Sequence, residues 1–410
     1  MDLLTIITIL IIISAAFSYL NVRIIKLPGA IGLVTISIVV SVLILIIGKT
    51  SNGLTNAVES FAGSIDFSKV LLNIMLGFLM FAGAFHFDYQ KLKEQRLPVF
   101  ILSTLGVIIS TAVFGGLLYG VTLLMHFNLP IIYCLLFGAI ISPTDPIAVE
   151  AILKTSKIPP RLDTIIAGES LFNDGVGLII FVIILGIADK PGSTSFTEVL
   201  HLFAQEVAGG IFIGLILGYL GYQLIKTITD FQTIFLISIA LVLAISVIAG
   251  HFHASIPLSA VTAGLIVGNK STDKPNIADQ FLGKIWQLVN DLLNTILFVM
   301  IGLQMVKMPF LQEHWITGLI AIVILLIARV ISVTIPAIVL LRRLNLSNLS
   351  ILTWAGLRGG ISVAMALTLP ESPYRELIIS GCYFVVIFSI IFQGLTLKKV
   401  VEIALRYKTG

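Results

Sequence analysis

Hydrophobic residues follow one another in long runs along this chain, and short polar connections separate the runs. About thirteen runs have the length of a helix that crosses a bilayer, which needs roughly 20 mostly apolar residues. The pattern predicts an all-α polytopic membrane protein with about 13 transmembrane helices. The predicted spans are 3–20, 30–48, 70–86, 98–126, 131–153, 161–188, 199–226, 232–249, 254–268, 284–305, 314–341, 349–369 and 376–397.

The composition agrees with a membrane protein and leaves little room for a soluble domain. Of the 410 residues, 58% are hydrophobic and 11% are charged, whereas soluble domains carry roughly 25% charged residues. No polar or Pro/Ser-rich linker divides the chain, so residues 1–410 are expected to form a single membrane unit. Cys134 and Cys382 lie in apolar stretches without metal-ligand spacing, which indicates packing residues rather than a disulfide or a zinc site.

The distribution of basic residues predicts how the chain crosses the membrane. When alternate connections are assigned to opposite sides, one side carries 18 Lys and Arg residues and the other carries 5. Cytoplasmic loops are enriched in basic residues, so the N-terminus is expected outside and the C-terminus in the cytoplasm of a bacterial cell. The net charge of +4 thus reflects topology and does not indicate nucleic-acid binding. The two remaining basic residues, Arg329 and Arg358, fall inside predicted spans.

The fifth predicted span contains two prolines in "GAIISPTDPIAV", residues 138–149. Pro143 and Pro146 have no amide hydrogen, so the carbonyls four residues earlier lose their usual helical donors. The helix is therefore expected to break near Thr144 and Asp145, which offers free carbonyls to a cation and a positive helix N-terminus to a carboxylate. A simple proline kink, capped by Asp145, is the alternative interpretation.

The sixth predicted span carries two carboxylates in "GESLFNDGVG", residues 168–177. A charge at the centre of a membrane helix costs about 2.5–3.5 kcal/mol, so such residues are retained for a partner or a function. Helical spacing places Glu169 and Asn173 on one face and Ser170 and Asp174 on the next. Asn173 is expected to hold Glu169 by a hydrogen bond, while Ser170 and Asp174 present oxygens to a hard cation. A structural hydrogen-bond cluster is the alternative.

Two buried arginines supply the opposite charge. Arg358 precedes Gly359 and Gly360 in "WAGLRGGISVAMAL", where the glycines permit the backbone to leave the helix. Pairing of Arg358 with Glu169 would leave neither charge uncompensated. Arg329 could offset Asp145 or the C-terminus of a half-helix, or extend toward the membrane interface.

The order of these stretches indicates an internal symmetry. The break at 143–146 falls in the middle of spans 4 to 6, and a second break at 358–360 falls in the middle of spans 11 to 13. The second set follows the first at an offset of seven spans, and because this number is odd, the two sets cross the membrane in opposite directions. The sequence therefore predicts an inverted repeat in which two broken helices cross at the binding site of a secondary transporter.

In these motifs the sequence resembles the electroneutral cation/proton antiporters, in the NhaP-type branch that also includes the animal sodium/proton exchangers. The segments "SPTDPIAV", "GESLFNDGVG" and "GLRGGISVAMAL" are similar to the family's signatures and occur in the family's order. The resemblance implies a core ion-transport domain formed by residues 98–188 and 312–402. Residues 1–97 and 189–311 would form the scaffold and the interface of a homodimer.

The resemblance also implies roles for individual residues. Asp174 matches the aspartate that binds the ion or the proton, and Ser170 and Thr144 match oxygen ligands, so sodium is expected at these three residues. Glu169 and Arg358 match a buried charge pair. The expected activity is exchange of a monovalent cation, sodium or lithium, for a proton by alternating access. No cofactor is implied besides the transported ions.

Within the resemblance, Asn173 organises that charge pair and Asp145 is the aspartate of the broken helix. If the other two carboxylates are each cancelled by an arginine or a helix end, Asp174 is the only carboxylate left to load. Asn173 stays neutral, whereas an aspartate at its position could carry a second proton. One proton should therefore exchange for one cation, without net charge movement.

Other functions fit the sequence less well. A cation channel could use broken helices, but channels commonly present a ring of acids, and here a single Asp174 is available. An intramembrane protease or an ATP-driven pump is not indicated, because no "HExxH" or "GxxxxGK[ST]" motif occurs, so the chain is not expected to be an enzyme. Potassium in place of sodium remains open as the exchanged cation.

Overall fold

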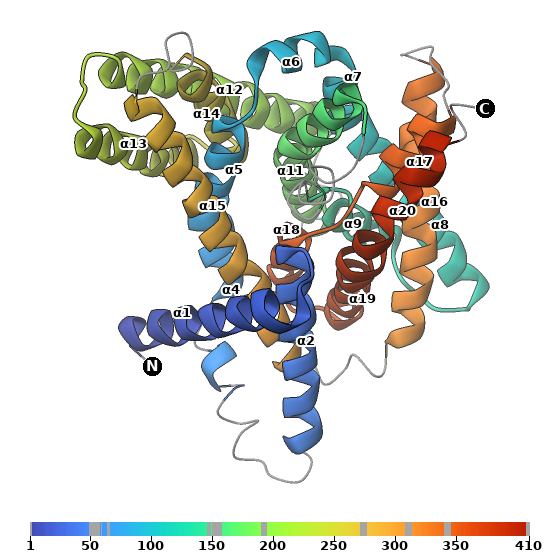
Figure 1. Cartoon of the computed structure of the whole chain (residues 1–410). Coiled ribbons are helices and arrows are strands. Elements are labelled where there is room, and N and C mark those ends of the chain that lie inside the picture. The colour runs from blue at the N-terminus through green and yellow to red at the C-terminus, as the bar shows by residue number, and fades with distance from the viewer. Residues whose placement is uncertain are drawn as a thin grey trace.

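The computed structural model describes residues 2–48, 58, 60–63, 66–145, 149, 158–189, 195–270, 277–307, 314–339 and 346–406. The described part is helical throughout (Figure 1). The α-helices in chain order are α1 (Leu3–Leu20), α2 (Gly29–Gly48), α4 (Phe67–Lys69), α5 (Leu76–Phe85), α6 (Tyr89–Glu94), α7 (Arg96–Ile101), α8 (Val107–Leu124), α9 (Ile131–Ile141), α11 (Pro160–Asp189), α12 (Phe196–Ile225), α13 (Phe231–His251), α14 (Ile256–Lys270), α15 (Ile277–Gln304), α16 (Trp315–Val339), α17 (Leu346–Trp354), α18 (Gly360–Leu367), α19 (Arg375–Ile387) and α20 (Gly394–Arg406).

Three π-helical segments join shorter helices into longer ones. The segment η2 (Val70–Met75) connects α4 to α5, η3 (Leu102–Gly106) connects α7 to α8, and η7 (Phe388–Gln393) connects α19 to α20. A π-turn inserts one extra residue into a helix and shifts the faces on either side of it. These joins explain why the sequence shows one apolar span where the structure has two helices.

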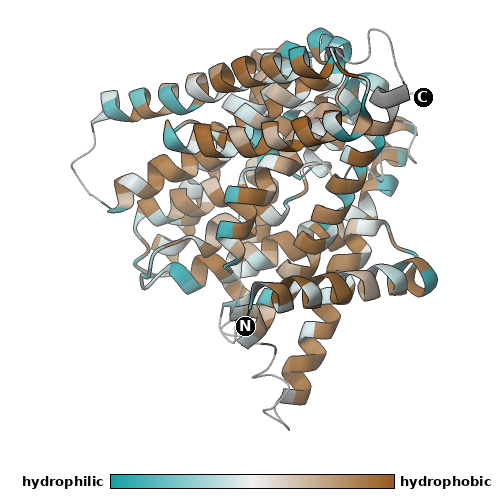
Figure 2. Ribbon diagram, turned by 90° about the vertical axis from the view of Figure 1, so that its left-hand side faces the viewer, coloured by the Kyte–Doolittle hydropathy of each residue, from teal (hydrophilic) through white to brown (hydrophobic). Residues whose placement is uncertain are grey.

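The helices correspond to the spans predicted from hydropathy. Ten helices within the described part are long and apolar enough to cross a membrane. Two shorter apolar helices, Ile131–Ile141 and Ile256–Asn269, and the interrupted pair α17 and α18 match the remaining predicted spans. Figure 2 shows hydrophobic residues along the helices and hydrophilic residues gathered toward their ends and connections. The prediction of an all-α polytopic membrane protein is confirmed.

Side chains at the helix starts agree with these boundaries. At the start of α12, the Ser195 hydroxyl accepts the Glu198 N–H at 3.2 Å, and the Glu198 carboxylate accepts the Ser195 N–H at 3.0 Å. The Asp230 carboxylate accepts the Thr233 N–H at 2.9 Å at the start of α13. Such caps satisfy amide donors that have no partner inside the helix, so they fix where each span begins.

The two interrupted helices meet at their breaks. The helix α9 ends at Ile141, just before Pro143, and the second interruption separates α17 from α18. The Asp145 N–H donates to the Leu357 carbonyl at 2.7 Å, which joins the two breaks directly. This crossing is the arrangement that the predicted inverted repeat requires. Pro146 and residues 147, 148 and 150–157, where the second half of the first broken helix is expected, lie outside the described residues.

The helices pack in two groups. One contains α1, α2, α5 and α12–α15, with its closest packing between α14 and α5 and between α14 and α12. The other contains α8, α9, α11 and α16–α19, with close packing of α8 on α9 and of α16 on α19. Contacts of α11 with α14 and of α18 with α15 connect the groups, and the candidate site lies at this connection.

Candidate ion-binding site

The helix α11 supplies four of the predicted site residues, and all four are buried. Glu169, Ser170, Asn173 and Asp174 each expose 3% of their surface or less. Their spacing distributes them over two neighbouring faces, as the helical period predicts. The surroundings of the two faces differ, so the residues have different roles.

Asn173 and Ser170, one from each face, bind the break in the fifth span. The Asn173 side-chain amide donates to the Thr144 hydroxyl at 2.7 Å, and the Asn173 amide oxygen accepts the Thr144 N–H at 3.2 Å. The Ser170 hydroxyl lies 2.9 Å from the Thr144 hydroxyl. The expectation that Asn173 holds Glu169 is therefore wrong. Because Thr144 follows Pro143 and lies outside any helix, its backbone N–H needs a partner, and Asn173 provides it.

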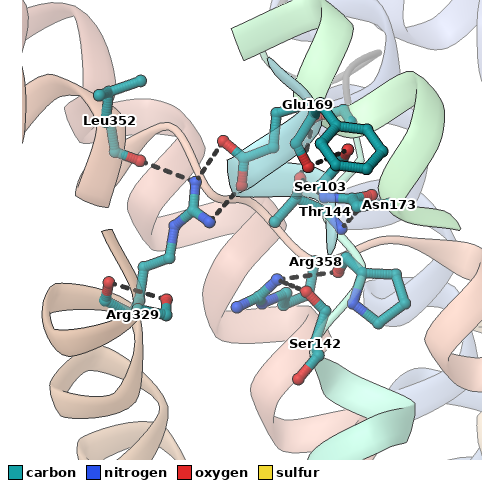
Figure 3. Close-up of polar contacts among 12 residues, drawn as sticks. Ser103, Ser142, Thr144, Glu169, Asn173, Arg329, Leu352 and Arg358 are labelled. Carbon is teal, nitrogen blue, oxygen red and sulfur yellow. Dashed lines mark hydrogen bonds and ion pairs between the residues drawn. The ribbon is translucent and has the colours of Figure 1, made fainter. Parts of the chain in front are cut away.

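Glu169 forms a buried ion pair with Arg329 of α16 (Figure 3). Its two carboxylate oxygens accept bonds from the two terminal nitrogens of Arg329, at 2.5 and 3.1 Å. Arg329 also donates to the Leu352 carbonyl in α17 at 3.0 Å. This two-point geometry is the strong form of an arginine–carboxylate contact. The predicted pairing of Glu169 with Arg358 is thus wrong: the partner is the other buried arginine.

Arg358 instead binds the broken end of α9. One terminal nitrogen of its guanidinium donates to the Ser142 and Pro143 carbonyls, the latter at 2.9 Å. The Ser142 carbonyl has no helical donor, because residue 146 is a proline. A fully buried positive charge at a helix C-terminus is favourable, since the carbonyls there carry partial negative charge. A half-helix C-terminus was one of the partners expected for Arg329, but here Arg358 occupies such an end and Arg329 binds Glu169.

Asp145 lies at the start of α18, which is the second half of the other broken helix. Its carboxylate contacts Gly359, the residue that caps α18, so closely that a Cβ on Gly359 would collide with it. The φ angle of Gly359 is −129°, which any residue can adopt, so the site requires glycine for space and not for backbone conformation. Of the two partners considered for Asp145, the helix end is the one observed, because Arg329 is bound to Glu169.

A cavity of about 70 Å³ lies where the breaks meet the other group of helices. Thr144, Asp145 and Asp174 line it from one side, and Asn290 and Asn294 of α15 line it from another. Across the described ranges, no hydrogen-bond donor or ion-pair partner reaches the Asp174 carboxylate. Ser170 lies behind Thr144 and does not line the cavity. Of the three predicted sodium ligands, two therefore face this space directly.

Asn290 and Asn294 were not among the site residues predicted from the sequence. A signal was present, because the two amides stand four residues apart in "NDLLN" within the span predicted at 284–305. They carry no charge, so they did not stand out among buried ionisable residues. Polar residues on one face of a membrane helix commonly face protein or a water-filled cavity.

The chain matches the family model "Sodium/hydrogen exchanger, transmembrane" over residues 10–403. It is 38% identical over 400 residues to the Na(+)/H(+) antiporter NhaP of Pseudomonas aeruginosa, which covers 95% of this chain and 94% of the relative. It is 31% identical to the antiporter NhaH of Halobacillus aidingensis, with 93% of each chain covered. Its fold is similar to that of the sodium proton antiporter MjNhaP1 from Methanocaldococcus jannaschii, with a TM-score of 0.78, 20% identity and 99% of both chains covered. The chain belongs to the sodium/hydrogen exchanger family, as its motifs predicted.

Proposed function

We propose that this protein exchanges sodium for protons across a membrane and that the Asp174 carboxylate carries each in turn. The relatives in Pseudomonas and Halobacillus are named sodium/proton antiporters, and the chain matches both of them over nearly its full length. The proposal connects that activity to one residue. It depends on how Asp174 differs from the other buried charges of the site.

The observation that carries the proposal is the unequal compensation of the buried charges. Glu169 is bound by Arg329, Arg358 by the end of α9, and Asp145 lies against the start of α18. Asp174 is 3% exposed, lines the cavity, and is reached by none of the described donors. A bare carboxylate in such a place is costly, so Asp174 binds either a proton or a cation. The two ligands compete for the same group.

One loading carboxylate implies electroneutral exchange, one proton for one cation. The core domain moves between its two orientations only when the Asp174 charge is neutralised, because moving a bare carboxylate would carry the full cost of burying its charge. Asn173, next to Asp174, is committed to Thr144 by both ends of its amide and adds no titrating group. Sodium would bind to Asp174 and Thr144 in the cavity, with Ser170 supporting the Thr144 hydroxyl.

The expected transport mechanism is alternating access. The core, residues 98–188 and 312–402, moves against a scaffold formed by residues 1–97 and 189–311, and the scaffold mediates homodimerisation. The packing of the described helices into two groups, with the cavity between them, supports this division. We further propose that the protein lies in a bacterial cytoplasmic membrane with its N-terminus outside and its C-terminus in the cytoplasm, from the distribution of basic residues.

The test is proton flux in everted vesicles, measured on addition of sodium, lithium and potassium in turn. Wild-type protein should release protons with sodium, and Asp174→Asn should abolish exchange while the protein stays folded, since the amide binds no proton in this pH range. Thermal unfolding in detergent checks the fold of the variant. Sodium-dependent proton flux retained by Asp174→Asn would contradict the assignment.

A further inference from the structure

Helix α15 contributes two asparagines to the cavity lining, and no hydrogen bond among the described residues joins either of them to a charged residue of the site. Asn290 and Asn294 stand one helical turn apart and line the same space as Asp174. Asn294 is the more buried, with 4% of its surface exposed. A neutral amide that is nearly removed from water needs partners for both of its ends.

Only one end of the Asn294 side chain has a partner. Its amide nitrogen donates to the Asn290 backbone carbonyl at 2.8 Å and to the Asn290 side-chain oxygen at 3.2 Å. Because only an N–H group can donate to a carbonyl oxygen, these bonds fix the orientation of the amide. The Asn294 oxygen therefore faces the other way, and in the described part of the chain it is buried without a hydrogen bond.

One other residue that lines the cavity has a side-chain oxygen in the same condition. Ser362 belongs to α18, is 1% exposed and lines the cavity, and its hydroxyl oxygen is also buried with no partner among the described residues. A buried polar group without a partner costs about 1–3 kcal/mol, so two of them beside one cavity indicate a ligand that enters it. A single water needs roughly 10–15 Å³, and the cavity of about 70 Å³ exceeds this.

We infer that the Asn294 oxygen and the Ser362 hydroxyl join Asp174 in the coordination of the transported cation and set its selectivity among monovalent cations. This inference rests on the proposed exchange. Oxygen atoms are the ligands that hard cations require. Both ligands are neutral, so they add no charge to the cycle and agree with one-for-one exchange. A proton sits on Asp174 alone and needs neither of them.

The difference between the two transported ions gives the test. Asn294→Ala should raise the sodium concentration for half-maximal proton flux about five- to tenfold, the size expected for loss of one neutral ligand. The ratio of the half-maximal concentrations for sodium and lithium should change with it. The pH dependence of the flux at saturating sodium should stay that of the wild type, because proton binding has lost nothing. Ser362→Ala should act in the same direction, with about a two- to fivefold effect.

Thr295→Val provides the matched control. Thr295 is the next residue on α15, its hydroxyl bonds among the described residues only to the Asp291 carbonyl of its own helix, and it is not among the residues that line the cavity. Its replacement should leave half-maximal sodium and the sodium-to-lithium ratio unchanged. If Asn294→Ala does not fold, the half-maximal sodium concentration and the sodium-to-lithium ratio of Ser362→Ala test the inference.

Three results separate this inference from the proposed function. Raised half-maximal sodium with an altered cation ratio supports the inference. An active wild type whose folded variants keep both wild-type values contradicts it, and water then satisfies the two oxygens. A wild type without sodium-dependent proton flux contradicts the proposed function itself.

Discussion

The two broken helices are interrupted by opposite kinds of residue. The first break contains Pro143 and Pro146 and removes amide donors from the chain. The second contains Gly356, Gly359 and Gly360 and removes side chains from it. Both interruptions leave a helix end in the middle of the protein, but the consequences for their surroundings differ.

The proline break creates free carbonyls, and the glycine break creates space. The carbonyls before the first break attract the guanidinium of Arg358. The glycines of the second break admit side chains from outside: Asp145 contacts Gly359, and Arg329 passes so close to Gly356 that a Cβ there would collide with it. Each broken helix thus places a charge at the interrupted end of the other. Asp145 lies at the start of α18, and Arg358 lies at the end of α9.

This exchange of charges shows why Asp174 stands apart. The breaks compensate each other, and the Glu169–Arg329 pair compensates itself, so the fixed charges of the core are internally balanced. Asp174, which no donor of the described residues reaches, is the carboxylate that we propose an ion from outside neutralises.

The largest effect is expected at the buried ion pair. Arg329→Ala should lower the free energy of unfolding by about 3–5 kcal/mol, because it leaves the Glu169 charge buried and unpaired. The measurement is a double-mutant cycle with Glu169→Ala, read by thermal or denaturant unfolding in detergent. The cycle should show strong coupling between the two residues.

The matched cycle uses the other arginine. Arg358 bonds to backbone carbonyls and not to Glu169, so coupling between Glu169→Ala and Arg358→Ala should be much weaker. Stronger coupling of Glu169 to Arg358 than to Arg329 would show that the arginines have the roles originally expected from the sequence.

A smaller effect is expected at the glycine break. Gly359→Ala should destabilise the protein by about 1–3 kcal/mol, since the added methyl group displaces the Asp145 carboxylate from the start of α18. The control is Gly186→Ala in α11, where a Cβ meets nothing within 4 Å. That change should stabilise the helix by about 0.5–1 kcal/mol. Equal melting temperatures for the two variants would mean that Gly359 does not provide space for Asp145.

The smallest effect on stability is expected for a charge at an exposed helix end. It serves as a comparison for the charges at the buried helix ends. Asp230 precedes α13, and its hydrogen bond with the Thr233 side chain, together with that to the Thr233 N–H, holds the pKa of its carboxyl below the ordinary value. A lowered pKa stabilises the folded state above the pKa of the unfolded chain, and this contribution is lost as pH falls through the folded pKa. Wild type should therefore melt slightly above Asp230→Ala at neutral pH, and the gap should narrow in acid.

The control for this pH dependence is Asp230→Asn, which can cap the helix without titrating. Its melting temperature should stay above that of Asp230→Ala by the same margin at both pH values. A wild-type advantage that grew in acid would contradict the assigned role of the Asp230 charge.

Much of the architecture could be predicted from the sequence because the bilayer constrains it strongly. Apolar run length fixes the spans, and prolines fix the first break at Pro143. Buried charges are costly enough that Asp174, Glu169, Arg329 and Arg358 could be selected as candidate site residues from the sequence. The family signatures then predicted the fold that the helices confirm.

The partners of the charges could not be predicted, because they depend on how separate helices rotate against one another. Spacing within α11 places Glu169 on a face but does not say which arginine meets it. The role of Gly359 was also misjudged, since a sequence shows that a side chain is missing but not what fills the space. Asn294 was overlooked because a neutral amide becomes conspicuous only when one of its ends is seen without a partner.

The most direct test of the account is the voltage dependence of exchange. Protein reconstituted into liposomes would be held at potassium/valinomycin potentials, with sodium and proton gradients fixed, and the set-point at which net proton flux vanishes would be measured. If Asp174 alone binds the transported ions, as we propose, the set-point should not move with voltage. A cycle that moved one net charge would be driven by about 2.3 kcal/mol per 100 mV. A set-point that shifts with potential would contradict one-for-one exchange and show that a second group, with Glu169 or Asp145 the first to examine, also binds a proton.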